Sequence, residues 1–204
     1  MIRFYRHPLS GHSHRVELLL TMLDLPFERV DVDILVGAHQ TPEFLAKNPF
    51  GQLPVIEDGD RTLADSNAIL TYLALRYDPA RRWLPADPVP AAQVQRWLSL
   101  AAGPLASGAA AARLANLAPI PIDVDAARKT ADGLLARMDA ALAGARWLAG
   151  TEPTLADLAL YAYTAHAPEG GVSLEPYPAV RTWLARVEDL PGFVPMRRTA
   201  VGLA

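Results

Sequence analysis

The chain has 204 residues, a formal net charge of −3, and basic and acidic side chains mixed along its length. It is long enough for one large or two small folded domains, and it lacks the broad basic field that nucleic-acid binding requires. No cysteine is present, which excludes disulfides, thiolate-bound zinc, iron–sulfur clusters and a cysteine nucleophile. Any thiol chemistry must therefore use the thiol of another molecule.

The hydrophobic segments are all short. The first residues run directly into polar side chains, and no stretch approaches the roughly 20 apolar residues that a membrane span requires. We therefore expect a cytoplasmic protein whose partners include neither a membrane nor nucleic acid.

The first 78 residues mix strand patterns with helix patterns. The expected elements, in chain order, are a strand at residues 2–5, a helix through 16–23, a strand at 27–34, a short helix after Thr41-Pro42, strands at 53–57 and 61–63, and a helix from Asp65-Ser66 to Tyr77. This order, β-α-β-α-β-β-α, predicts a mixed α/β domain.

Prolines then accumulate at positions 79, 85, 88 and 90. Proline is excluded from helix interiors, so this stretch predicts a linker. Alanine-rich helical segments are expected beyond it at residues 91–115, 124–143, 154–166 and 177–188, with a short one after Pro191. We therefore expect an α/β domain over residues 1–78, a linker over 79–90 and an all-helical bundle over 91–204.

The loop between the first expected strand and helix contains Ser10 and Ser13. Loop hydroxyls and helix N-terminal amides attract an anion, and a thiolate is such an anion. A hydroxyl that donates a hydrogen bond to sulfur favours the thiolate of a group whose ordinary pKa is about 8.5. Ser10 is the candidate donor. The alternative is that the serine only caps the helix, and of the two serines Ser13 is the preferred cap.

The same loop holds His7, His12 and His14. Three histidines suggest a metal, but their spacing completes no recognised ligand set with an acidic or cysteine partner. We interpret the loop as polar and expect no metal site.

Two further segments have the chemistry of a peptide-binding site. Residues 48–55 place Pro54 at the entry of a strand, and a cis Leu53–Pro54 bond would leave the Leu53 backbone free to pair with a peptide-like ligand. Asp65 and Ser66 begin a helix, where both are good caps. In a functional reading, Ser66 receives a carboxylate and Asp65 faces an ammonium group, which are the two ends of an α-amino acid.

Taken in order, these motifs resemble the cytosolic glutathione transferase superfamily over essentially the whole chain, closest to its bacterial and theta- or delta-like branches that use serine. The matching residues are Ser10 with Val16, residues 37–44, residues 48–54, the Asp65-Ser66 pair, and residues 150–157, in which Thr154 and Asp157 form the capping box of a buried helix. The resemblance implies a thioredoxin-like N-terminal domain and an all-α helical-bundle C-terminal domain.

The resemblance also implies roles for single residues. Ser10 would be the catalytic residue that activates the thiol of glutathione, a co-substrate. His39 would contact the glycine carboxylate, although an exposed loop histidine is the alternative reading. The implied glutathione-binding residues are His39, Gln52, Leu53, Pro54, Asp65 and Ser66. Two features depart from the family pattern: the loop reads Gly-His-Ser-His at residues 11–14, and Asn67 stands where an arginine is common.

The expected function is conjugation of the glutathione thiolate to a hydrophobic electrophile, a detoxification reaction. The expected second-substrate residues are His12, Trp97, Leu100, Ala101 and Leu105, although such a stripe is also typical of a helix core. The alternatives are a glutathione-dependent peroxidase or isomerase on the same fold and a non-catalytic binding module. We also expect a homodimer, formed through the alanine-rich helix of residues 91–115.

Overall fold

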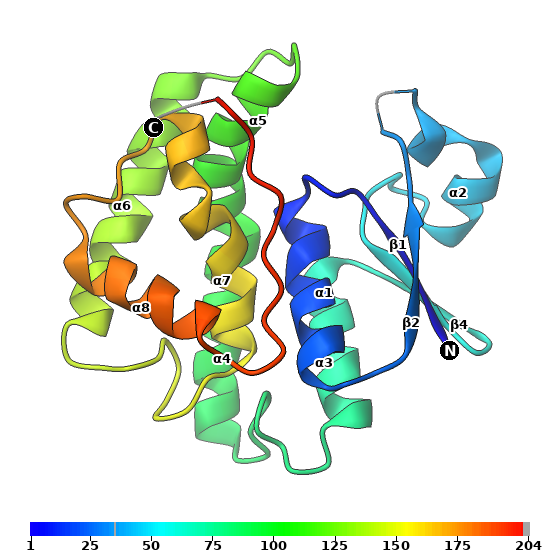
Figure 1. Ribbon diagram of the computed structural model, residues 1–204, viewed down its shortest axis with the longest axis horizontal. Helices are drawn as coiled ribbons and strands as arrows, with labels where there is room; N and C mark the ends of the chain where they lie inside the picture. The colour runs from blue at the N-terminus through cyan, green and yellow to red at the C-terminus, as the bar shows by residue number, and fades with distance from the viewer. Residues whose placement is uncertain (35, 202–204) are drawn as a thin grey trace. The chain divides into compact units, whose positions relative to one another are not determined.

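The computed structural model describes residues 1–34 and 36–201, and the chain divides into two compact units (Figure 1). The sheet unit contains Met1–Ala80 together with Pro191–Arg197, and the helical unit contains Arg81–Leu190 and the chain from Arg198 onward. Residues 202–204 of the expected helical domain lie outside the described part. The first division falls within the expected linker, whereas residues 191–197 belong to the sheet unit instead of the bundle.

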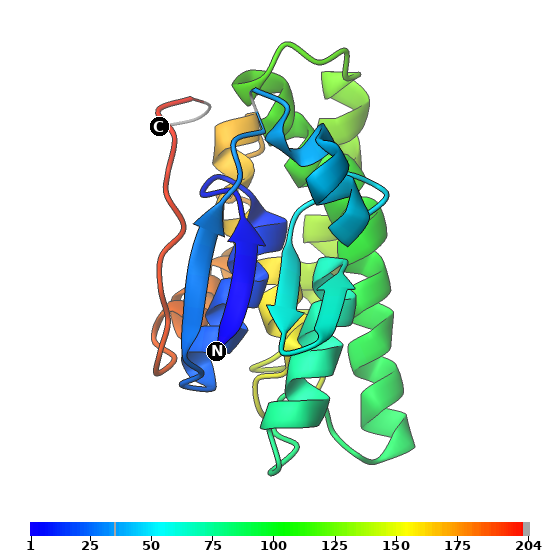
Figure 2. The ribbon, with the colours of Figure 1, turned by 90° about the vertical axis from the view of Figure 1, so that its right-hand side faces the viewer.

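The sheet unit has the expected order of strands and helices. Its elements are β1 (Ile2–Arg6), α1 (Gly11–Met22), β2 (Phe27–Asp31), the 3-10 helix η1 (Ala38–Gln40), α2 (Pro42–Lys47), β3 (Val55–Asp58), β4 (Arg61–Ala64) and α3 (Ser66–Tyr77). The strands lie in the order β2-β1-β3-β4 (Figure 2), with β1 parallel to β2 and antiparallel to β3, and β3 antiparallel to β4. Helices α1 and α3 lie on one side of the sheet and α2 on the other (Figure 1). This is the thioredoxin-like arrangement.

Strand β2 is shorter than the alternation of apolar residues predicts. The expected strand ran to Ile34, but β2 ends at Asp31. Asp31 pairs with Arg6, which is the last residue of β1, so the neighbouring strand offers no further partner. Val32 N still donates to Arg6 O (2.8 Å), and the Val32 side chain is buried with Tyr5, Phe44 and Val55. The alternation of apolar residues therefore extends beyond the strand, into a loop that packs on the sheet.

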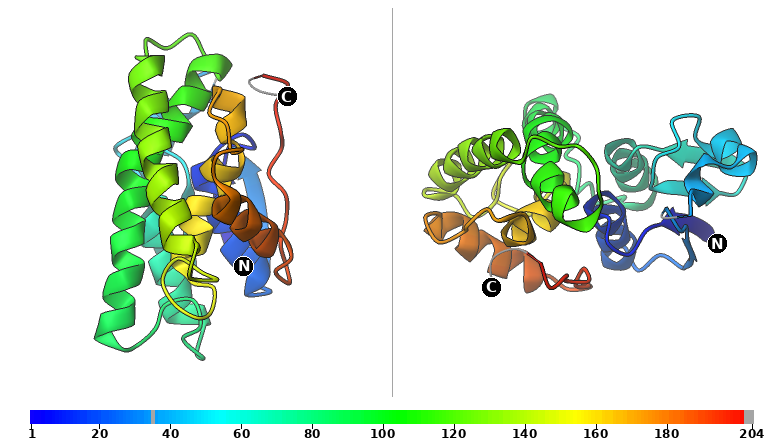
Figure 3. Two further views of the ribbon diagram at one scale, coloured as in Figure 1. Left: turned by 90° about the vertical axis from the view of Figure 1, so that its left-hand side faces the viewer. Right: turned by 90° about the horizontal axis from the view of Figure 1, so that it is seen from above.

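The helical unit contains the four long helical regions that the sequence predicts. Its elements are α4 (Pro88–Leu100), the π-helix η2 (Ala101–Ala110), α5 (Ala111–Leu117), α6 (Val124–Leu142), α7 (Leu155–Ala165), the 3-10 helix η3 (Ala167–Gly170) and α8 (Pro178–Glu188). Helix α4 starts inside the expected linker, because Pro88 and Pro90 occupy its first turn, where a missing amide proton removes no helical bond. Helix α7 is packed against α4, η2, α8 and η3 (Figure 3).

A π-helix interrupts the helix that was expected to run unbroken over residues 91–115. Pro104 lies inside η2 and has no amide proton to offer the α-helical ladder. Gly108 faces α6 so closely that a Cβ there would lie 2.8 Å from Ala131 N. The wider π turn accommodates the proline while the backbone keeps this contact.

The start of α7 is the capping box that the sequence predicts. Thr154 Oγ1 accepts a hydrogen bond from Ala156 N (3.2 Å), and Asp157 Oδ2 accepts one from Thr154 N (2.9 Å). Asp157 Oδ1 additionally accepts from Leu148 N (3.0 Å) and Trp183 Nε1 (2.8 Å). The box therefore also fixes the preceding loop and α8.

The segment after α8 is extended and contains no helix among its described residues. The prediction of a short helix after Pro191 is therefore wrong. Side-chain contacts hold the segment to α1 instead: His14 Nε2 lies 2.8 Å from Val194 O, and the His14 and Phe193 rings meet edge to face. Of the helices described here, none is long and apolar enough to cross a membrane.

Candidate active site

The topology brings the predicted site segments to one edge of the sheet. Strand β1 is antiparallel to β3 and β3 to β4, so the end of β1, the start of β3 and the end of β4 lie together, in register at Tyr5, Val55 and Ala64. The parallel partner β2 ends at the same edge. The segments that leave or enter the sheet there carry Ser10, the 38–40 turn, Leu53-Pro54 and Asp65-Ser66. A ligand at this edge would meet all of them.

Ser10, rather than Ser13, is the N-cap of α1. Ser10 Oγ accepts a hydrogen bond from Ser13 N (3.2 Å), whereas Ser13 is buried and its Oγ accepts from His7 N (3.3 Å). The preference for Ser13 as the cap is therefore wrong, because the helix starts at Gly11, one residue after Ser10. The cap uses only the oxygen of Ser10 as an acceptor, and its hydroxyl proton has no acceptor among the described residues.

The three histidines of the loop have three different surroundings. His7 Nδ1 accepts from Leu9 N (3.3 Å), His14 contacts Val194 O, and His12 Nδ1 lies 3.5 Å from Ser66 Oγ. Within residues 1–34 and 36–201, no cluster of three or more histidine, aspartate or glutamate side chains is arranged to hold a metal ion. His12, expected at the second-substrate site, thus faces a residue expected to bind the γ-glutamyl group.

Ser66 and Asn67, in the first turn of α3, both contact α1. Arg15 Nη1 donates to Ser66 Oγ (3.3 Å) and to Asn67 Oδ1 (2.9 Å), and both Arg15 and Ser66 are buried. Asn67, where the resemblance led us to expect arginine, therefore accepts a bond from an arginine on another helix. Burial, and then the charge of Arg15, lower the pKa of His12 to about 3, which keeps its ring neutral at physiological pH.

Asp65 is the N-cap of α3, with Oδ1 accepting from Ala68 N (2.9 Å). Its backbone has a φ of 69°, a left-handed value that costs a non-glycine residue about 1–2 kcal/mol. The side chain is exposed. A strained, exposed acid next to the buried Ser66 hydroxyl is consistent with a site that receives a charged group.

The Leu53–Pro54 bond is cis, as the sequence pattern predicts. No hydrogen bond joins the Leu53 backbone to another described residue, since β3 begins at Val55. The preceding Gln52 is exposed, and its carbonyl accepts from Asn48 Nδ2 (2.8 Å). The Leu53 backbone is therefore free to pair with an extended ligand.

His39 lies in η1, directly beside the turn that leads to Leu53. A Cβ on Gly51 would lie 3.1 Å from the His39 carbonyl oxygen, and Ala38 and Leu53 pack on the same buried cluster. His39 is half-buried, and its Nδ1 is buried without a partner among the described residues. The buried side of the ring therefore carries Nδ1.

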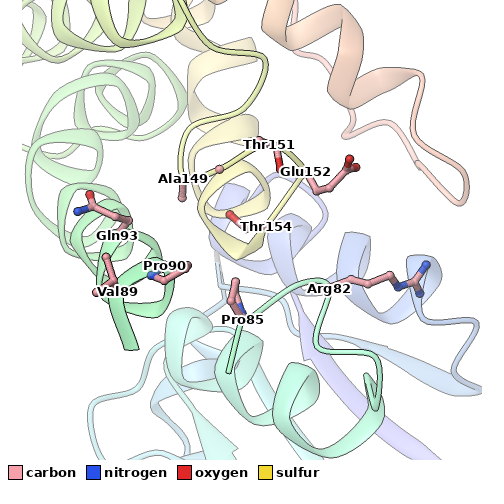
Figure 4. A pocket seen from close by; sticks show the side chains of 10 residues that line it. Arg82, Pro85, Val89, Pro90, Gln93, Ala149, Thr151, Glu152 and Thr154 are labelled. Atoms are coloured by element: carbon pink, nitrogen blue, oxygen red, sulfur yellow. The ribbon is translucent and has the colours of Figure 1, made fainter. Parts of the chain in front are cut away.

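The residues expected at the second-substrate site are distributed over both units. Trp97, Ala101 and Leu105 are buried and Leu100 is half-buried. None of them lines the pocket of about 470 Å³ in the helical unit (Figure 4). The residues that line this pocket are Arg82, Pro85, Val89, Pro90, Gln93, Ala149, Gly150, Thr151, Glu152 and Thr154. The second-substrate assignment stays a prediction.

Arg15 and Asn48 are residues of this edge to which sequence reasoning gave no role. Asn48 Oδ1 accepts from Phe50 N (3.1 Å), and its amide holds Gln52 O, so it shapes the turn before Leu53. Arg15 lies three and four residues before Leu18 and Leu19, which places a charged side chain on the apolar face of the helix, and this was the signal that could have identified it.

Comparisons with known proteins match both units. A model described as glutathione S-transferase, N-terminal domain, matches residues 2–75, and the corresponding C-terminal domain model matches residues 119–191. The chain is 35% identical to glutathione S-transferase 3 of Zea mays, covering 94% of this chain and 91% of that protein. It is 31% identical to glutathione S-transferase GstB of Escherichia coli K12, covering 94% and 95%.

The solved structures agree with these matches. A crystal structure of a glutathione S-transferase from Pseudomonas fluorescens has a TM-score of 0.90 and 37% identity, and the match covers 96% of this chain and 98% of that one. The likeness therefore extends over both units and includes the segments at the sheet edge.

Proposed function

The chain belongs to the glutathione S-transferase family, and on that premise we propose that its sheet unit binds glutathione at the edge described above and transfers the thiolate to a hydrophobic electrophile. The observation that carries the proposal is the convergence of Ser10, His39, Leu53 and Ser66 at one sheet edge. Each offers a hydrogen-bonding group that suits one part of the tripeptide.

Ser10 has the geometry required to stabilise a thiolate. It accepts one bond as the cap of α1, and its proton remains available to a sulfur anion near the helix N-terminus. Capping and catalysis therefore use opposite sides of the same hydroxyl and are compatible. The bond, stronger to the thiolate than to the thiol, lowers the pKa of bound glutathione.

The remaining groups match the ends of glutathione. The free Leu53 backbone pairs with the cysteinyl part, and His39 Nε2 faces the glycine carboxylate. Gln52, Asp65 and Ser66 hold the γ-glutamyl group. Asp65 does so by facing the ammonium of that group. The residues proposed to bind the second substrate are those predicted from the sequence, namely His12, Trp97, Leu100, Ala101 and Leu105.

The active form is proposed to be a two-fold homodimer. The exposed residues of η2 are small, namely Ala102, Gly103 and Ser107, so the outer face of this helix is flat enough for close packing. Sedimentation should give twice the chain mass of 22.0 kDa at micromolar concentration. A monomer under these conditions would contradict the proposal.

The experiment that tests the function combines binding, turnover and titration of the thiol. Wild-type protein should be retained on immobilised glutathione and turn over a chromogenic electrophile, and Ser10→Ala should raise the pKa of bound glutathione in an ultraviolet titration. Activity of Ser10→Ala near neutral pH should fall and recover partly in alkali, whereas Ser13→Ala should leave the titration unchanged. Retention without turnover would instead favour a binding module, and peroxide reduction without conjugation a peroxidase.

A further inference from the structure

A hydrogen-bonded link joins the second turn of α1, which carries Arg15, to the first turn of α3. Arg15 Nη1 donates to both Ser66 Oγ (3.3 Å) and Asn67 Oδ1 (2.9 Å), with Arg15 1% and Ser66 4% exposed. A guanidinium has only donors, so at both contacts the partner oxygen must accept. The helix that Ser10 caps thereby fixes the orientation of the proposed γ-glutamyl subsite.

This contact determines where the proton of Ser66 can go. Because Arg15 occupies an acceptor position on Ser66 Oγ, the hydroxyl proton must point away from the guanidinium. His12 Nδ1 lies 3.5 Å away, at the limit of a hydrogen bond, and its ring is neutral because burial and the Arg15 charge lower its pKa to about 3. A carboxylate is a much stronger acceptor than a neutral ring at that distance. The Ser66 proton is therefore available to an arriving carboxylate.

The charge of Arg15 favours the same ligand group. Arg15 is buried, so its field is screened less than that of a surface cation, and its effect is already visible on the neighbouring His12. Asn67 is neutral, and Asp65, the acid next to Ser66, is exposed and accepts a bond from Ala68 N. The charge of Arg15 would attract a carboxylate that binds beside Ser66.

Building on the glutathione binding proposed above, we propose that Arg15 is a positioning residue for the α-carboxylate of the γ-glutamyl group. It acts through Ser66: its guanidinium fills the acceptor side of the hydroxyl, turns the proton toward the ligand and supplies the favourable charge. Asn67 stands where an arginine is common in the family pattern, and in this chain it accepts a bond from Arg15 of α1.

The test compares two ligands that differ in one group. Glutathione and its analogue with a 4-aminobutyryl group in place of the γ-glutamyl group share every feature except this α-carboxylate. In calorimetric titration, Arg15→Met should weaken glutathione binding at least about tenfold and leave the affinity for the analogue unchanged. Arg15→Lys, which keeps the charge, should recover part of the loss. At saturating glutathione, kcat of Arg15→Met should stay near wild type while KM rises.

Two controls separate positioning from a loss of fold. Arg113 is an equally buried arginine in the helical unit, paired with Glu169 (2.6 Å), so Arg113→Met should lower stability without changing the ratio of the two affinities. In a Ser66→Ala background, the effect of Arg15→Met on that ratio should largely disappear, because the two residues act together. If Arg15→Met does not fold, the ratio of the two affinities is measured in Arg15→Lys and in Ser66→Ala instead.

The outcomes are distinct. Equal weakening of both ligands by Arg15→Met, or no weakening of either, would overturn the role of Arg15 while leaving glutathione binding intact. A wild-type protein that binds neither ligand would overturn the proposed function itself.

Discussion

The first turns of α7 and α1 are both capped by hydroxyl side chains, but the protein uses their remaining hydrogen-bonding capacity differently. At α7, Thr154 is buried and the carboxylate of Asp157 accepts bonds from two backbone amides and from Trp183 Nε1. At α1, Ser10 is half-buried and accepts a single hydrogen bond. Its hydroxyl proton has no acceptor among the described residues. A cap whose donors and acceptors are consumed internally stabilises the fold, whereas one with capacity left over can also bind a ligand.

The largest effect is expected at the fully used cap. Asp157→Ala should lower the free energy of unfolding by about 3–5 kcal/mol, because Leu148 N, Thr154 N and Trp183 Nε1 would lose their acceptor in a buried place. Urea unfolding measures this, with the thiol pKa of bound glutathione unchanged.

The matched control for this prediction is Asp139, a half-buried carboxylate that accepts from Ala179 N and Val180 N at the start of α8. Asp139→Ala should have a smaller effect, about 1–2 kcal/mol. If Asp157→Ala were less destabilised than Asp139→Ala, the comparison would fail. The internal hydrogen bonds of a capping carboxylate would then not predict its contribution to the free energy of unfolding.

Acid pH should lower the stability of the helical unit at a second carboxylate that accepts several hydrogen bonds. Burial alone would raise the pKa of Glu169, but hydrogen bonds from Thr199, Arg113 and His166 outweigh it and lower this pKa to about 2. The folded pKa lies below the ordinary value of about 4.3, so the stability this group contributes is complete above that value. It is lost as pH falls from about 4.5 to 2, and it amounts to roughly 2–3 kcal/mol.

Glu169→Gln isolates this contribution. The unfolding free energy of wild type should fall more steeply than that of Glu169→Gln between pH 4.5 and 2.5. His166 adds acid lability at higher pH, because burial lowers its pKa and its neutral form is the folded one. Parallel curves for the two proteins below pH 4.5 would show that Glu169 is not the titrating group.

The β-α-β-α-β-β-α order and the four long helical regions followed from apolar periodicity, caps and prolines, because these are local signals. The end of β2 and the extended segment after α8 did not, since they depend on partners distant in sequence: Asp31 on Arg6, and Val194 on His14. The π-helix around Pro104 also lacks a local signature, because proline alone equally predicts a kink or an end.

At the site, the sequence identified single residues better than their contacts. Ser10 was placed correctly beside a helix start, but whether it or Ser13 caps α1 depended on a helix boundary uncertain by a few residues from sequence alone. Arg15 was missed because its role depends on α3, which lies next to α1 only in the folded chain.

A smaller effect compares the two hydroxyl caps directly. Thr154→Ala should cost about 1–2 kcal/mol and Ser10→Ala about 0.5–1 kcal/mol, since Thr154 is the more deeply buried of the two. Only Ser10→Ala should change the titration of the bound thiol. Denaturant unfolding and ultraviolet titration of both variants test this, and a raised thiol pKa in Thr154→Ala would refute the division between the two caps.

The smallest change in stability is expected at Asp65, where it should have the opposite sign from an ordinary cap. Asp65 caps α3 at a φ of 69°, while Asp87 caps α4 at a φ of −66° and accepts from Val89 N (2.9 Å). Glycine replaces an aspartate cap at a loss of only a few tenths of a kcal/mol and removes the strain of a positive φ, so Asp65→Gly should be neutral or stabilising by up to about 1 kcal/mol. Asp87→Gly relieves no strain and should destabilise by about 0.5–1 kcal/mol. Glutathione affinity should fall in Asp65→Gly alone, because only that variant loses the partner of the ligand ammonium. Equal destabilisation of the two variants would mean that the backbone at Asp65 is not strained, and the site would then keep its acid at no expense to the fold.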